Sequence, residues 1–286
     1  METSTKLGLG VRVLSEFPRR ASSASRFGSP HIALTRGEGS AALPPSSLVC
    51  WSHPEWAQRF PWLVQGTTGR SPGADGGDFR LFGEGDVTDN EKNWQTLALS
   101  HGFGGIVHGQ QVHGMQISLH AGPPTGLAIG PDADGHASSA AGALMAVTVA
   151  DCVPVFLVDP HKRVAVVLHA GWRGAEAGVL ERGLEVLADE FGSEPPDLLM
   201  HLGPAICGSC YEVGPEVHVA LGLPEPPGPA PVDLRAVMAE KAVERGLLRA
   251  QITRSWFCTL CQGSPFFSHR RGEAQRQVGF IGLRSS

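Results

Sequence analysis

The sequence predicts an α/β (α+β) fold with mixed β-sheets, on two observations. Short β-branched runs bounded by turn residues alternate along the chain with longer segments whose apolar residues recur at helical spacing. In addition, 42% of the 286 residues are hydrophobic, which is enough to bury a large core. Strands and helices that are mixed in this order are typical of helices packed against a sheet.

The expected strands are short apolar runs. Residues 143–150 and 153–158 are bounded by turn residues, so both are expected to be buried strands. Residues 104–120 alternate in polarity and predict a strand, a loop and a second strand. The remaining expected strands are 163–172, 197–205 and 277–283.

Three segments are expected to be helices. Residues 89–102 begin with Asp and Asn, carry apolar residues at helical spacing and end at Gly. Residues 174–192 place leucines and a phenylalanine on one face and also end at Gly. Residues 232–246 form the third helix, and the Pro- and Gly-rich residues 222–231 before it form a loop.

The chain is expected to have two parts. Residues 1–48 are rich in Ser, Ala, Arg, Pro and Gly, so we expect a disordered N-terminal extension. An organelle-targeting peptide is the alternative, although the glutamates of this segment fit it poorly. Residues 49–286 are expected to form a single domain, with regular structure beginning near residue 60.

Composition excludes some functions. A net charge of −5 argues against a nucleic-acid partner. No apolar stretch approaches the ~18–20 residues that a membrane span requires, so no membrane partner is expected. Without an export signal, the six cysteines are expected to be thiols or ligands in a reducing, cytoplasmic compartment. The oligomeric state does not follow from the sequence.

The chemistry is expected where strands end. The run "VTVADCVPVF" puts Asp151 and Cys152 between two buried strands, which is costly unless these groups are paired or bound to a metal. His113 in "QQVHGM" and His169 in "VVLHAGWRG" stand at comparable strand ends. Together, His113, Cys152 and His169 would form an N/S/N set with one open coordination position, as in catalytic zinc sites. The alternative is a buried thiol and two hydrogen-bonded structural histidines.

Several motifs in this order resemble one family. They are "QVHG", "ADCVPVFLVD", "HAGWRGAEAGVL", "LGPAICGSCYEVGPEV" and "CTLCQGSPFFSHRRGEAQRQVGFI". This pattern is similar to the YfiH/YlmD family, also called laccase-domain or multicopper polyphenol oxidase-like, which includes mammalian FAMIN. The resemblance implies a layered α/β/β/α sandwich. It also implies a purine nucleoside phosphorylase that cleaves adenosine, inosine, guanosine and 5′-methylthioadenosine with phosphate, and that can deaminate adenosine.

The resemblance also implies site residues. The family's metal ligands fall on His113, Cys152 and His169, with Zn²⁺ as the expected ion and Cu²⁺ as an alternative. The family's "T-R-x-G-G" turn reads "TTGRSPGADGG" here, with Arg70 as the best match. The family's "SYRRD" reads "SHRRG", so a role for its Tyr or Asp is in doubt here.

The expected partners are purine nucleosides and phosphate. "GWRG" stands between a strand and a helix, so Gly171 and Arg173 are expected to help bind phosphate. The other residues expected to bind phosphate are Arg70 and the Arg270–Arg271 pair, because guanidinium groups fit phosphate oxygens. Asp151 is interpreted as a general acid or base, or as an anchor for a ligand imidazole, with the anchor role favoured.

Other interpretations stay open. Cys152 could be the nucleophile of a Cys–His hydrolase, or the chain could bind purines or metal without catalysis. A His₂Cys site can also hold copper and oxidise phenols weakly. The pairs "CGSC" and "CTLC" lie too far apart for a zinc ribbon, so four thiols are expected there. "HPE" at 53–55 echoes zinc deaminases but falls in a segment expected to lack regular structure.

Overall fold

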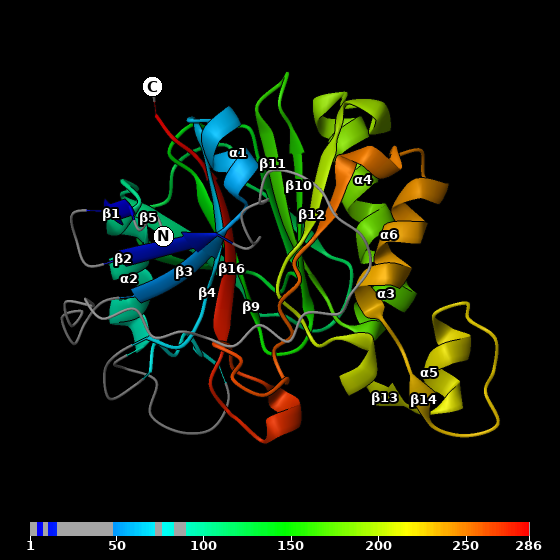
Figure 1. Ribbon diagram of the computed structural model, residues 1–286. Helices are drawn as coiled ribbons and strands as arrows, with labels where there is room; N and C mark the ends of the chain where they lie inside the picture. Colours follow the sequence, from blue (N-terminus) through cyan, green and yellow to red (C-terminus); the bar gives the residue numbers. More distant parts are fainter. Residues whose placement is uncertain (1–4, 8–10, 16–47, 72–75, 83–89, 286) are drawn as a thin grey trace, which may run out of the picture.

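Two mixed β-sheets lie face to face, and helices cover their outer faces (Figure 1). The computed structural model describes residues 5–7, 11–15, 48–71, 76–82 and 90–285. The order of the layers is helix, sheet, sheet, helix, which confirms the predicted α/β/β/α class. None of the described helices combines the length and the apolar composition needed to cross a bilayer.

The first sheet has its last strand in sequence near the centre. Its order is β1-β2-β3-β4-β16-β9-β5-β7. β16 pairs antiparallel with both β4 and β9, whereas β9, β5 and β7 run parallel. The strands are β1 (Thr5–Leu7), β2 (Val11–Ser15), β3 (Leu48–Ser52), β4 (Leu63–Thr68), β16 (Gln277–Leu283), β9 (Leu144–Val149), β5 (Gly105–Gly109) and β7 (Gly126–Gly130).

The second sheet is built around two wholly buried strands, β10 and β11. Its order is β15-β12-β10-β11-β8-β6, with parallel pairing only at the two edges. The strands are β15 (Ile252–Arg254), β12 (Leu199–Leu202), β10 (Val153–Asp159), β11 (Val164–Ala170), β8 (Gly135–Ser138) and β6 (Ile117–Leu119). A separate two-stranded ribbon pairs β13 (Glu212–Val213) with β14 (Ala230–Pro231).

The helices form the two outer layers. α2 packs on the outer face of the first sheet, where Trp94 and Leu97 are fully buried. α3, α4 and α6 cover the second sheet, and Leu180 of α4 is buried against it. The helices are α1 (Pro54–Arg59), α2 (Asn90–Ser100), α3 (Trp172–Ala177), α4 (Val179–Phe191), α5 (Pro215–Ala220) and α6 (Leu234–Glu244).

An apolar layer holds the two sheets together. Met145 and Val147 of β9 meet Phe156 and Val158 of β10 in one buried cluster. Burying each of these side chains contributes about 1.5–3 kcal/mol. Because β9 belongs to the first sheet and β10 to the second, residues 150–152 form a corner between the sheets. Asp151 and Cys152 therefore lie in a connection between two strands rather than within one.

Most predicted elements are confirmed, including β16 at 277–283 and α2 within 89–102. The predicted helix 174–192 is wrong in one respect, because Gly178 adopts φ 91° and divides it into α3 and α4. Regular structure also begins earlier than residue 60. His53 is the N-cap of α1 and is buried, so "HPE" begins a helix and does not lie in an irregular segment.

The N-terminal extension is only partly described. Residues 5–7 and 11–15 form strands β1 and β2 at the edge of the first sheet. The rest of 1–47 lies outside the described residues, and for that part the disorder expected of 1–48 stays a prediction. The predicted loop at 222–231 holds only the short strand β14 at its end.

Candidate active site

The corner between the two sheets is tied to the C-terminal part of the chain through Asp151. The backbone of Asp151 has φ 86°, a left-handed conformation that costs a non-glycine residue about 1–2 kcal/mol. One carboxylate oxygen accepts from the Thr259 hydroxyl at 2.6 Å and the other from the Arg270 N–H at 2.7 Å. The Ile206 N–H donates to the carbonyl of Asp151 at 3.1 Å. These hydrogen bonds offset the strain and fix the direction in which Cys152 leaves the corner.

A second buried carboxylate organises the loop between β5 and β6. Asp134, just before β8, has no exposed surface. It accepts backbone N–H bonds from Val112 at 3.2 Å, His113 at 3.0 Å and Gly114 at 2.7 Å. His113 has φ 60°, also left-handed, and the three bonds hold it in that conformation.

The same carboxylate orients His169 at the end of β11. The Nδ1–H of His169 donates to Asp134 at 2.9 Å, so Nε2 is left for other partners. Asp134 therefore holds both histidines, one through its loop backbone and one through its ring. This is the anchor role that the sequence interpretation gave to Asp151, and here that interpretation is wrong. Both oxygens of Asp151 accept from Thr259 and Arg270 instead.

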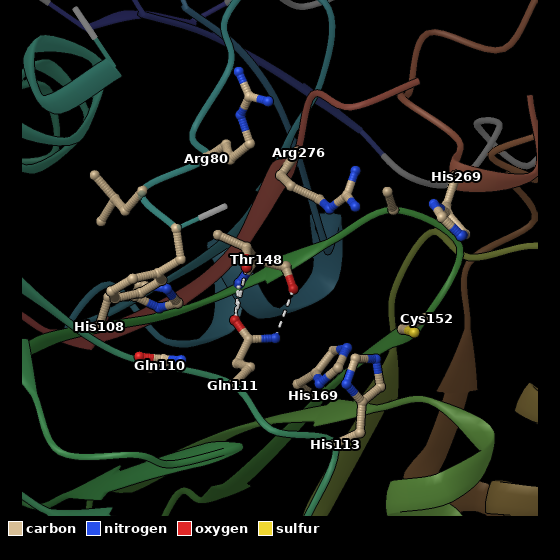
Figure 2. A pocket seen from close by; sticks show the side chains of 13 residues that line it. Arg80, His108, Gln110, Gln111, His113, Thr148, Cys152, His169, His269 and Arg276 are labelled. Carbon is tan, nitrogen blue, oxygen red and sulfur yellow. Dashed lines mark hydrogen bonds between the residues drawn. The ribbon is translucent and has the colours of Figure 1, made fainter. Parts of the chain in front are cut away.

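The structure brings the three predicted metal ligands together. One nitrogen from each of His113 and His169 and the sulfur of Cys152 lie within 4.8 Å of one another. The two imidazole rings are 4.8 Å apart at an interplanar angle of 75°, and Figure 2 shows them beside the thiol. Gly171 makes this approach possible, because a Cβ there would lie 3.0 Å from the sulfur of Cys152.

The electrostatics favour a charged thiol–imidazole pair. Burial alone would raise the pKa of Cys152, but His169 and His113 together lower it to about 6. Burial alone would lower the pKa of His169, but Cys152 and Asp134 raise it to about 9. Burial also opposes the ionisation of Asp134, yet its bonds from His169 and the Gly114 N–H hold its pKa below the usual value. At neutral pH the site thus favours a thiolate, which is the form that binds metal.

This donor set fits a metal ion. Two imidazoles and one thiolate are suitable ligands for Zn²⁺ or Cu²⁺, and three protein ligands leave a position for another ligand. A carboxylate behind a histidine ligand, as Asp134 is behind His169, is the usual way in which such rings are oriented.

The three donors lie at one end of a polar cavity of about 330 Å³. That volume lies at the small end of the range for ligand sites, about 300–1,000 Å³. Gln111 spans part of the wall, with three hydrogen bonds to Thr148 (Figure 2). The cavity is lined by Arg80, Leu81, Phe82, His108, Gln110, Gln111, His113, Thr148, Ala150, Cys152, His169, His269 and Arg276.

The arginines that reach the cavity are not the predicted ones. Arg80 and Arg276 both line it; Figure 2 shows the Arg276 side chain just above Thr148 and the Arg80 guanidinium directed away from Thr148. Arg70 instead pairs with Glu273 and lies 4.7 Å from the ring of Phe267.

The other predicted arginines are engaged nearby. Arg271 donates to the carbonyls of Thr259 and Leu260, both at 3.0 Å, and so supports the C-terminal segment. Arg270 donates to the carbonyl of Glu212 and covers the ring of Tyr211.

Arg173 is exposed and lies over Trp172, at the start of the six-residue helix α3 that Gly171 caps. Within the described chain, none of the four predicted arginines lines this cavity. Their role in binding phosphate, and that of Gly171, stays a prediction.

Sequence reasoning missed Asp134, Arg80 and Arg276. The signal for Asp134 was weak, because "PDADGH" shows only two acids before a short strand. Arg276 could have been noticed as the residue directly before the last expected strand.

Comparison with known proteins decides the family. Residues 68–284 match the family described as multi-copper polyphenol oxidoreductase laccase. The chain belongs to this family. The match confirms the resemblance drawn from the motifs.

Relatives in the family carry the name purine nucleoside phosphorylase. YlmD of Geobacillus stearothermophilus is 31% identical over 254 residues, which cover 80% of this chain and 93% of the relative. The Xylella fastidiosa protein is 34% identical over 194 residues, covering 63% and 73%.

Solved structures of family members have the same fold. The Bacillus licheniformis hypothetical protein YfiH has a TM-score of 0.71 and 26% identity, covering 80% of this chain and 94% of that protein. The crystal structure of Geobacillus stearothermophilus YlmD has a TM-score of 0.71 and 29% identity, covering 79% and 93%.

The first prediction concerns the ionisation of Cys152. In metal-free protein, its alkylation by iodoacetamide should follow a thiolate that titrates near pH 6, because the histidines lower its pKa. The reaction should therefore be nearly at its maximum rate at pH 7 and slow down as the pH falls through 6. Peptide mass spectrometry, which separates Cys152 from the other cysteines, gives the rate.

The His169→Ala variant is the comparison for this experiment. Losing the imidazolium should move the titration of Cys152 to higher pH. Buried Cys50 should resist alkylation in both proteins. A midpoint that is the same with and without the His169 ring would contradict the thiolate–imidazolium pair.

The second prediction concerns Asp134. The Asp134→Asn variant should bind Zn²⁺ about 10–100-fold more weakly, because it no longer orients His169 and the His113 loop with a full charge. Competition with a chromophoric chelator measures the affinity. Exposed Asp132, two residues away, is the matched control as Asp132→Asn. Equal affinities in the two variants would show that Asp134 does not support the site.

Proposed function

We propose that this chain is a metal-dependent purine nucleoside phosphorylase, acting on adenosine, inosine, guanosine and 5′-methylthioadenosine, with adenosine deamination as a side activity. One observation carries the proposal: His113, Cys152 and His169 converge beside a cavity that also presents two arginines. The relatives named purine nucleoside phosphorylase support this choice of reaction.

The reaction needs a place for phosphate. In phosphorolysis a phosphate oxygen bonds to C1′ of the ribose, the C1′–N9 bond breaks, and its electron pair leaves with the purine. Arg80 and Arg276 supply positive charge in the cavity for the dianion. Arg276 is fixed for this purpose by bonds from its Nη1 to the carbonyls of residues 273–275.

The departing purine needs an aromatic surface and a proton donor. Phe82 offers an open ring, 37% exposed, 5.9 Å from the ring of His108. His269 and Gln110 line the same cavity and can hydrogen-bond to purine nitrogens. In this proposal His269 gives a proton to the leaving base, and Gln110 contacts its edge.

The metal would be held by His113, Cys152 and His169. When bound, Zn²⁺ supplies Lewis-acid chemistry that can serve both phosphorolysis and deamination. Asp134 keeps the His169 ring in the tautomer that leaves Nε2 for the ion. We place the enzyme in the cytoplasm, where a reducing environment preserves the Cys152 thiolate.

A second function is supported by a separate observation. The imidazolium of His169 lies between two negative groups, the thiolate of Cys152 and the carboxylate of Asp134. This is the arrangement of a Cys–His hydrolase. In that case Cys152 would attack an acyl carbon without metal. The two functions differ in whether phosphate and a metal are required.

The third prediction tests the two functions together. With inosine, the zinc-loaded protein should release hypoxanthine and ribose 1-phosphate only when phosphate is present. His113→Ala and His169→Ala should each lose most of this activity and the metal held at this site, because two ligands hold zinc poorly. Chromatography of the products and elemental analysis give both values. Full turnover by a metal-free protein, or an acyl adduct on Cys152, would favour the hydrolase.

The fourth prediction concerns phosphate recognition. Arg276→Gln should raise the KM for phosphate about 10–100-fold, the effect of losing one charge-assisted bond, and change the KM for nucleoside little. Arg70→Gln serves as comparison, because the Arg70 guanidinium pairs with Glu273. If the Arg70 variant alone raised the KM for phosphate, the sequence-based assignment would be right and the assignment to Arg276 wrong.

A further inference from the structure

Four thiols gather outside the candidate active site. After β12, Cys207 caps a short 3₁₀ turn that ends at Cys210, and Cys258 and Cys261 follow β15. Their sulfur atoms all lie within 4.8 Å of one another. We call these residues the four-cysteine cluster; none of them is part of the set formed by His113, Cys152 and His169.

The fold joins the two pairs despite their separation in sequence. β12 and β15 are neighbours and run parallel, with Leu202 opposite Arg254. The chains that leave these strands continue side by side, with Ala205 bridged to Cys258 and the Thr259 N–H bonded to the carbonyl of Ala205. The sequence gap that argued against a zinc ribbon does not separate the two pairs in space, because residues 211–257 leave the sheet and return to it.

The spacing of the sulfurs matches tetrahedral coordination of a metal ion. The sulfur of Cys261 lies 3.9 Å from that of Cys207 and 3.7 Å from that of Cys210. Four sulfurs at about 2.3 Å from a central Zn²⁺ are about 3.8 Å apart along each edge of the tetrahedron. A disulfide would need about 2.05 Å, and all four thiols are free.

Hydrogen-bond donors and a buried cation surround the cluster. Two backbone N–H groups, from Cys207 and Leu260, point at the sulfur of Cys258 at 3.3 and 3.4 Å. The buried guanidinium of Arg235 lies close by and donates to the carbonyls of Ser255 and Phe257. Backbone donors and a buried cation offset the negative charge of four thiolates around a divalent ion.

We propose that the four-cysteine cluster binds a structural Zn²⁺. Four protein ligands close the coordination sphere, unlike the three donors beside the cavity, so this ion would fasten the chain and would not react. Its binding would release the protons of the thiols.

The ion would support the corner that carries Cys152. Thr259 lies between two ligands of the cluster, and its hydroxyl donates to Asp151. Arg271 donates to the carbonyls of Thr259 and Leu260, and the neighbouring Arg270 N–H donates to Asp151. A zinc ion here would thus hold the two segments that keep Asp151 in its left-handed conformation.

The test uses full-length protein purified with zinc under reducing conditions. In the triple variant His113→Ala, Cys152→Ala, His169→Ala, elemental analysis should still find about one zinc per chain, and X-ray absorption should show four sulfurs at about 2.3 Å. Adding Cys207→Ser and Cys261→Ser should remove that zinc. Adding Cys50→Ala instead, at a cysteine outside both groups, should leave it in place.

The proposal would be overturned if the folded triple variant contained no zinc. It would also be overturned if the zinc remained after Cys207 and Cys261 had been replaced. If the triple variant does not fold, X-ray absorption on the unaltered protein decides. A mainly sulfur shell supports the four-cysteine cluster, and a shell of one sulfur and two nitrogens overturns it. Neither result depends on catalytic activity, so failure here and failure of the proposed phosphorylase are distinguishable.

Discussion

The buried carboxylate of Asp134 is the constraint on which the site depends. A charge without exposed surface is stable only when its oxygens are satisfied, and here three backbone N–H groups and one imidazole do so. The same bonds force His113 into a left-handed conformation and fix the ring of His169. One acid therefore sets the positions of two side chains that are far apart in sequence. Neither strand β8 nor strand β11 could move without breaking this arrangement.

The third member of the site is set by the join between the two sheets. Since β9 and β10 belong to different sheets, the chain must turn sharply at residues 150–152. Asp151, next to Cys152, stabilises that turn by accepting hydrogen bonds from the Thr259 hydroxyl and the Arg270 N–H. The reactive thiol thus rests on a corner whose supports come from the last third of the chain, close to the four-cysteine cluster.

The sequence predicted the features that depend on neighbouring residues along the chain, such as apolar strands and the polar residues at their ends. The strands around Cys152 and His169 are uniformly apolar, and polar groups at their ends stood out for that reason. Asp134 could not be found in this way, because its role arises from N–H groups of residues 112–114 that only the fold brings to it. Arg70 and Arg271 matched motifs, yet Glu273 and nearby carbonyls engage them. The long gap in sequence between the two Cys pairs argued against a shared zinc site for a related reason. The parallel pairing of β12 and β15 brings the pairs together whatever their separation along the chain.

The place of β16 has a consequence for how the protein is made. This strand lies between β4 and β9, so a growing chain has both neighbours long before the strand that joins them. Until β16 has been synthesised, β4 and β9 each present an open edge, and sheet edges of that kind pair readily with other chains. His269 and Arg276 reach the cavity from the segment just before β16. Completing the first sheet and completing the cavity are thus one event, and a chain that stops before His269 lacks both.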